Sequence, residues 1–215
     1  MRPPTELEEK GIEQALIEQH TGPLKNQELL YAKQYDKVVQ TMNECAQEHL
    51  VDGNEIGAAN DLHLIGCAER ELKNYEKSID AFKEARALFK QNKEVIHVAR
   101  CDQKIASCLI ELGEGELALE TARKAVDVFE TGHDHRRENF AQFEYGKAQI
   151  LLEKFDDALA TLEQVLSVVS EDEPKDFEFI QQNLCFAIFK LGEIFAAVVM
   201  PSFKDIYCTA GSFKG

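Results

Sequence analysis

The densest group of ionisable side chains in the sequence is the run from His133 to Arg137. Two histidines flank Asp134, and two arginines follow them. Imidazole and carboxylate groups are ligands that zinc and other transition metals accept. Consecutive residues of a loop rarely converge on one ion, however, and neither a cysteine nor a third ligand is fixed nearby. We therefore expect this run to be a joint between two helices, with Asp134 as the N-cap of the second.

The six cysteines do not have the spacing of a metal or redox site, because none of them forms a CxxC pair. Cys45, Cys101, Cys108 and Cys185 fall inside helical patterns, where a buried thiol packs as a small apolar group. Cys67 is the exception, because its register turns it towards a candidate binding face. A reducing cytoplasm is the expected compartment.

The sequence also lacks the motifs of common enzymes. His20, His49, His63 and His97 stand singly, without a serine or cysteine partner at a recognisable spacing. Neither a Walker loop nor a dinucleotide-binding glycine fingerprint occurs, and Gly113 to Gly115 reads as a tight turn between helices. We therefore expect no catalytic residues, no metal and no cofactor, and no enzyme activity.

The excess of acidic side chains indicates which classes of partner the chain would bind. The chain carries 39 acidic and 24 basic side chains, which gives a formal net charge of −15. Such a field repels nucleic acid and anionic membranes and favours basic partners, although acidity also simply keeps repeat proteins in solution. A charged-then-apolar leader and an uncharged apolar run of about 20 residues are both missing. We expect neither nucleic acid nor a membrane as partner.

An internal sequence repeat predicts the helices that would position any functional site. The pattern of Asp61 to Arg86 returns forty residues later and forty residues later again, without insertions. Small residues recur in the middle of the first helix of each unit, at Gly66, Ala106 and Gly146. Small residues at these positions let a second helix approach closely. Constant register over several units predicts an array of helical hairpins that pack on their neighbours.

The segments KNYEKSIDAFKEA, GEGELALETARKA and EKFDDALATLEQV carry the strongest form of this pattern. Their order of small, aromatic and aliphatic residues resembles the tetratricopeptide repeat (TPR), and the resemblance covers roughly Leu24 to Val169. Trp is missing from the first helices, Pro does not close the second helices, and the period is longer than the usual 34, as in longer-helix variants of the family. The resemblance implies an all-α fold, an α-α superhelix (solenoid) of about four to five TPR-like hairpins.

We expect three parts in a single elongated domain. A capping helix occupies residues 1–20, TPR-like repeats occupy 21–176, and a degenerate repeat with a tail occupies 177–215. The predicted repeats are 21–55, 56–95, 96–135 and 136–176.

In TPR proteins the first helices line a concave groove, so the resemblance implies groove positions in this chain. The predicted partner-binding residues are His63, Arg70, Arg100, Lys104, Phe140, Phe143 and Lys147. Arg100, Lys104 and Lys147 could hold a carboxylate or an acidic peptide, with the two phenylalanines as apolar anchors. Alternatively, these cations pair with Glu111 and Glu144 on neighbouring turns.

Arg100 with Lys104 also resembles the basic pair with which some TPR proteins clamp a partner's C-terminal carboxylate. The rest of that clamp is not matched. Pro23, Gln27 and Leu64 stand where the clamp requires Lys and Asn.

The leading functional hypothesis is a non-catalytic scaffold that binds a peptide or helix of a partner protein in the groove. One alternative is a peptide-sensing regulatory segment of a larger signalling protein. Another is an assembly subunit that self-associates through the apolar segment near the C-terminus. The self-association residues would be Ile194, Phe195, Val198, Val199 and Phe203.

Overall fold

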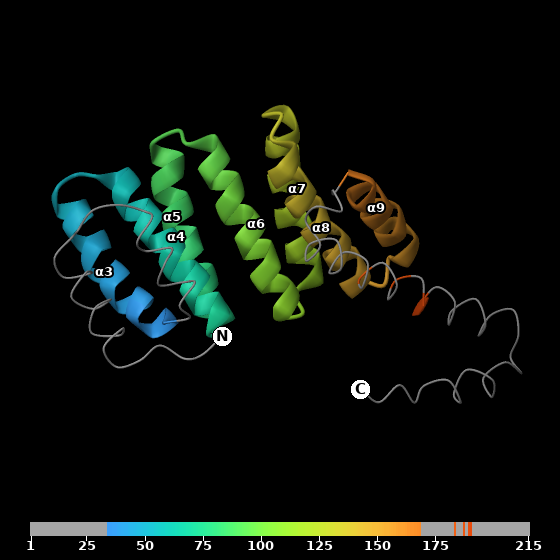
Figure 1. Ribbon diagram of the computed structural model, residues 1–215, viewed down its shortest axis with the longest axis horizontal. Coiled ribbons are helices and arrows are strands. Elements are labelled where there is room, and N and C mark those ends of the chain that lie inside the picture. The colour runs from blue at the N-terminus through green and yellow to red at the C-terminus, as the bar shows by residue number, and fades with distance from the viewer. Residues whose placement is uncertain (1–33, 169–182, 184–186, 188, 191–215) are drawn as a thin grey trace, which may run out of the picture. The chain divides into compact units, whose positions relative to one another are not determined.

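The computed structural model describes residues 34–168 together with residues 183, 187, 189 and 190. Consecutive helices fill the long described stretch (Figure 1), and the described residues include no strand. The helices are α3 (Tyr35–Val51), α4 (Glu55–Glu71), α5 (Tyr75–Gln91), α6 (Val95–Glu111), α7 (Gly115–Thr131), α8 (His135–Leu151) and α9 (Phe155–Val168).

A new helix begins every twenty residues from α3 to α9. The helices from α3 to α8 each have 17 residues. A three-residue connection such as 52–54 separates each helix from the next. Two helices with their connections therefore occupy the forty-residue period that the sequence predicts.

The connections share one backbone geometry. After α4, the backbone N–H of Lys73 donates to the carbonyl of Arg70 at 2.9 Å, and that of Asn74 donates to the carbonyl of Glu69 at 2.9 Å. These two bonds define a Schellman motif, which needs a left-handed residue at its corner. Positive φ angles occur at the equivalent corner of every connection, namely at Gly53, Lys73, Lys93, Gly113, His133 and Glu153. Because each corner lies two residues before the start of the next helix, the period stays constant.

Small residues allow neighbouring helices to pack closely, as the sequence predicts. A Cβ atom placed on Gly66 of α4 would lie 2.7 Å from the ring of Phe82, which is fully buried in α5. At the equivalent place in α8, a Cβ atom on Gly146 would lie 2.9 Å from the side chain of Leu162 in α9. In these two hairpins the second helix therefore lies directly on the glycine of the first.

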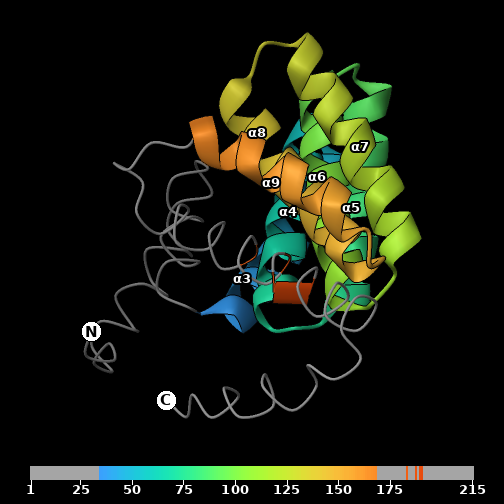
Figure 2. The same ribbon diagram turned by 90° about the vertical axis from the view of Figure 1, so that its right-hand side faces the viewer.

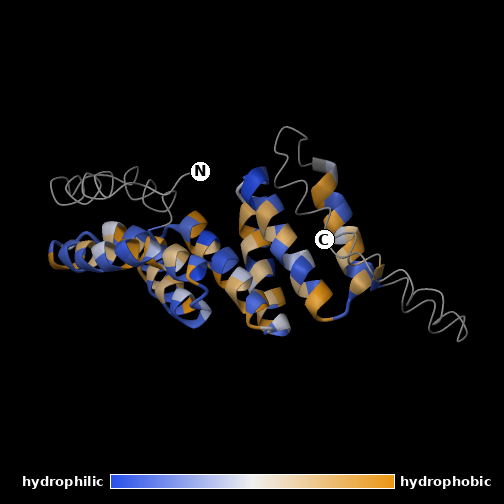
Figure 3. Cartoon of the chain, turned by 60° about the horizontal axis from the view of Figure 1, so that its bottom comes forward, coloured by the Kyte–Doolittle hydropathy of each residue, from blue (hydrophilic) through white to orange (hydrophobic). Residues whose placement is uncertain are grey.

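The chain divides into two compact units, Met1–Lys104 and Ile105–Gly215, and the boundary falls within α6. In the first unit α4 packs against both α3 and α5, and in the second α8 packs against both α7 and α9 (Figures 1 and 2). Hydrophilic and hydrophobic residues are mixed along the helices (Figure 3).

Separate apolar clusters form the cores of the units. In the first unit Val38 and Met42 of α3 pack with Ile65 of α4. In the second unit Phe143 of α8 packs with Leu162 and Val165 of α9.

Several predicted segments lie outside the described residues. They include the capping helix over 1–20, the beginning of the first repeat up to residue 33 and, apart from four single positions, the final repeat over 177–215. Cys185 and the predicted self-association residues from Ile194 to Phe203 are among them. Within the described part of the chain, every helix is too short or too polar to serve as a membrane span.

Candidate functional site

A stripe of α4 carries three of the side chains singled out in the sequence. His63, Cys67 and Arg70 follow one another at spacings of four and three residues, which places them on one side of a helix. The Cys67 Sγ atom lies 3.8 Å from the Nδ1 atom of His63. The His63 ring also makes an edge-to-face contact with Phe82 of α5, with 5.2 Å between the ring centroids. The stripe is thereby anchored to the second helix of the hairpin.

Arg100 and Lys104 lie one turn apart on α6, and the charges of both act on His63 and Cys67. Beside the larger effect of burial, they and Arg70 lower the pKa of His63 and oppose the rise in the pKa of Cys67. Since such effects require proximity, these three cations from two helices lie near the same pair of side chains. We call His63, Cys67, Arg70, Arg100 and Lys104 the cationic face of the first unit.

Burial keeps the two central side chains of this face uncharged. Desolvation is the largest cause of the lowered pKa of His63, which falls to about 3, and the repulsion from Arg100 and Lys104 comes next. Burial also raises the pKa of the Cys67 thiol, although the three cations oppose that rise. At neutral pH the imidazole and the thiol are therefore neutral, and the net charge of the face comes from its cations.

The Nε2 atom of His63 is buried and has no hydrogen-bond partner among the described residues. A buried polar atom without a partner costs free energy, and such atoms are rare in folded proteins. The cationic face therefore includes an unsatisfied polar group beside its charges.

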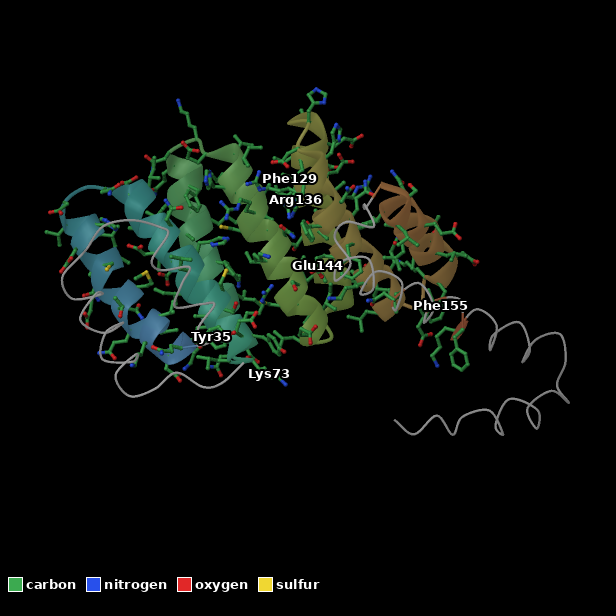
Figure 4. All side chains as sticks on the ribbon, viewed as in Figure 1. Tyr35, Lys73, Phe129, Arg136, Glu144 and Phe155 are labelled. Carbon is green, nitrogen blue, oxygen red and sulfur yellow. The ribbon has the colours of Figure 1, made fainter. Side chains whose placement is uncertain are left out.

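Acidic residues of the same helices engage some of the predicted cations. The Arg70 Nη2 atom lies 3.0 Å from Glu71 Oε1, and Lys147 Nζ lies 3.2 Å from Glu144 Oε2. The alternative that Lys147 pairs with Glu144 is thus confirmed. Figure 4 shows Glu144 on α8.

The remaining predicted contacts, Phe140, Phe143 and Lys147, lie on α8 in the second unit. Only 7% of Phe143 is exposed, because its ring packs in the core. Lys147 Nζ lies 5.6 Å from the centroid of that ring. Phe140 is partly buried. Of the two predicted apolar anchors, Phe143 is therefore a core residue, and only Phe140 is partly accessible.

The run from His133 to Arg137 has the capping role that the sequence predicts. Asp134 is the N-cap of α8, and its Oδ1 atom accepts a hydrogen bond from the backbone N–H of Arg137 at 3.2 Å. The Nδ1 atom of His135 lies 3.2 Å from a carboxylate oxygen of Glu138. The centroids of the His133 and His135 rings are 6.4 Å apart. Within residues 34–168 and the four further positions, no three His, Cys, Asp or Glu side chains are arranged to hold a metal ion.

Two half-buried side-chain contacts that the sequence did not indicate connect helices of the first unit. His49 of α3 lies 2.7 Å from the nearly buried carboxylate of Asp61 in α4. Arg86 of α5 lies 2.7 Å from that of Asp102 in α6. Both acids lie on first helices and both partners on the preceding second helices, so these pairs are structural ties.

Comparisons with known proteins identify the fold. Two crystal structures of a Podosopora anserina putative kinesin light chain with nearly identical TPR-like repeats are similar to this chain. One of them, a Gln-to-Met variant, has a TM-score of 0.64 and 14% sequence identity, over 78% of this chain and 84% of that one. The other has a TM-score of 0.63 and 14% identity, over 87% of this chain and 93% of that one.

No protein-family model and no curated protein matched the sequence. The structural similarity, together with the regular succession of helices, confirms the prediction of an all-α, TPR-like repeat fold of the α-solenoid class.

Proposed function

We propose that the protein is a non-catalytic interaction module whose cationic face binds an acidic segment of a partner protein. TPR-like helical repeats generally act as scaffolds for protein interactions, which supports the broad class. The observation that carries the specific proposal is the convergence of Arg70, Arg100 and Lys104 on one place in a chain with a formal net charge of −15.

The chemistry of the face fits carboxylates. Arg70 and Arg100 carry planar guanidinium groups whose geometry suits carboxylates, as the contact of Arg70 with Glu71 illustrates, and Lys104 adds a point charge. Because His63 and Cys67 stay neutral, they add no further charge for a ligand to balance. Because the rest of the chain is strongly acidic, it repels an acidic ligand, and the electrostatic field of the protein therefore favours approach to the cationic face.

In the second unit, Phe140 and Lys147 remain proposed contacts for a partner. Phe143 would contribute by supporting them from the core. We also propose the cytoplasm as the location, since Cys45, Cys67, Cys101 and Cys108 are all free thiols.

Affinity capture from a lysate of source cells tests the proposal. The wild-type chain is compared with an Arg100→Glu, Lys104→Glu variant and with a control, Lys83→Glu, Lys90→Glu, which changes the charge equally on exposed positions of α5. All three chains must melt at the same temperature. A protein captured by the wild type and the control but lost with the first variant, and bound through an acidic segment, supports the proposal. Capture by all three chains alike contradicts it.

A further inference from the structure

The second unit contains a recess that none of the residues predicted from the sequence lines. It has a volume of about 290 Å³ and lies where α7, α8 and α9 meet. It is lined by Arg123, Val126 and Asp127 of α7, by Gln142 and Tyr145 of α8, and by Thr161 and Gln164 of α9.

This recess is separate from the predicted contacts on α8. Successive residues of an α-helix are about 100° apart around its axis. Gln142 and Tyr145 therefore lie on the side of α8 opposite Phe140 and Lys147. Helix α8 accordingly offers two distinct surfaces within the second unit.

Two opposite charges stand at the α7 wall without pairing with each other. Arg123 and Asp127 are one turn apart, a spacing at which ion pairs often form. Next to Arg123, Lys124 forms such a pair with Glu120 at 2.7 Å. Neither the guanidinium of Arg123 nor the carboxylate of Asp127 has an ion-pair partner among the described residues. The wall therefore presents one cation and one anion to a ligand.

The rest of the lining offers uncharged hydrogen-bonding groups. The Nε2 atom of Gln142 donates to Glu138 at 3.2 Å, which leaves its second N–H and its amide oxygen for other partners. The hydroxyl of Tyr145 and the carboxamide of Gln164 have no hydrogen-bond partner within the described part of the chain. A carboxamide both donates and accepts, as a peptide group does, so the two glutamines match the main chain of a polypeptide.

We infer that this recess binds an extended polypeptide segment in which an acidic and a basic residue are separated by one residue. In an extended chain, alternate side chains lie on the same side about 6.6 to 6.8 Å apart. That distance is close to the separation of about 5 to 6 Å between neighbouring turns of α7. The acidic side chain pairs with Arg123, the basic one pairs with Asp127, and the intervening peptide groups meet Gln142 and Gln164. Val126 and the Tyr145 ring support the intervening residue.

The size of the recess limits the segment to a few residues. Its volume of about 290 Å³ is at the lower end for ligand sites. Because a ligand of this size gains only a modest binding free energy per atom, the expected Kd is on the order of 0.1 to 1 mM.

The test uses a neutral probe, the acetylated and amidated peptide Gly-Ser-Glu-Gly-Lys-Ser-Gly, titrated into the full ¹⁵N-labelled chain. Saturable NMR shifts are expected at residues of α7, α8 and α9 around the recess. A control peptide with Gln in place of both Glu and Lys should bind about fivefold more weakly or worse.

Three variants complete the test. Arg123→Gln and Asp127→Asn should each weaken probe binding about threefold or more, whereas Lys124→Gln, one residue away on α7, should leave it unchanged. All must retain the wild-type NMR spectrum away from the substitution. Four results overturn the inference: no saturable shift up to about 5 mM probe, shifts confined to other helices, equal binding of the Gln control peptide, or no effect of either Arg123→Gln or Asp127→Asn. Because the probe is uncharged overall and the recess is in the second unit, the outcome is independent of the cationic face.

Discussion

At the scale of single residues, His63 shows how burial and charge act together. Its imidazole contacts the ring of Phe82 and the thiol of Cys67, its burial disfavours the charged form, and Arg100 and Lys104 repel a proton on it. The folded protein therefore binds a proton at His63 only near pH 3, whereas an unfolded chain does so near the ordinary value of 6.5.

This difference predicts an acid-sensitive contribution to stability. Between pH 6.5 and about 3 the unfolded state takes up a proton at His63 that the folded state does not. The contribution is therefore complete above pH 6.5 and is lost as the pH falls through this window. Urea unfolding at a series of pH values should show a steeper decline for the wild type than for His63→Gln. Parallel curves for the two proteins would mean that His63 is not buried in its neutral form.

A second prediction at this scale concerns Gly66. Adding a methyl group there brings a carbon within 2.7 Å of the fully buried Phe82 ring. Overpacking of this kind costs about 1 to 3 kcal/mol, and the better helix propensity of alanine recovers about 0.5 to 1 kcal/mol. Gly66→Ala should therefore lower the free energy of unfolding by about 1 to 2 kcal/mol.

Glu114→Ala is a suitable control for Gly66→Ala. Glu114 is exposed and makes no side-chain capping bond, so its removal should change stability by less than about 0.5 kcal/mol. Urea unfolding of both variants measures the difference. Equal stabilities would show that α4 and α5 are not as close as described.

At the scale of elements, the connections between helices set the period of the whole array. Each uses a left-handed corner residue, but only two of the corners in the described chain are glycines. A side chain in this conformation costs about 1 to 2 kcal/mol, and glycine avoids that cost while losing more backbone entropy on folding.

Two substitutions at equivalent corners should therefore act in opposite directions. Lys93→Gly should stabilise the protein by about 0.5 to 1 kcal/mol, and Gly113→Ala should destabilise it by about 1 to 2 kcal/mol. No atom lies within 4 Å of a Cβ placed on Gly113, so the latter effect would come from the backbone alone. Thermal unfolding with a calorimeter would measure both. Effects of the same sign would contradict the left-handed geometry at one of the two corners.

At the scale of the whole molecule, the sequence predicted the repeat more completely than it predicted the surfaces. The period and the close glycine contacts follow from residues in one column of the repeat, such as Gly66 and Gly146, which depend on local packing. The stripe of His63, Cys67 and Arg70 was likewise predictable from helical spacing.

Features that depend on contacts between helices could not be predicted from the repeat pattern. Helix α8 has apolar residues on several sides, so its sequence does not distinguish a core ring at Phe143 from a surface ring at Phe140. The ties from Arg86 to Asp102 and from His49 to Asp61 depend on contacts between helices that no periodicity specifies. The recess also needs three helices at once. In sequence, its charged lining residues look like an ordinary solvated face.

The central claim is that the cationic face binds carboxylates through the positions of Arg100 and Lys104, and not only through the net charge of the protein. Fluorescence anisotropy with a labelled Gly-Glu-Glu-Gly-Glu-Glu-Gly peptide tests it directly, at about 20 mM salt, where screening is weak. Arg100→Glu, Lys104→Glu should weaken binding about tenfold or more, while Lys83→Glu, Lys90→Glu should weaken it about twofold at most. An equal loss with both double variants, or no measurable binding by the wild type, would contradict the claim.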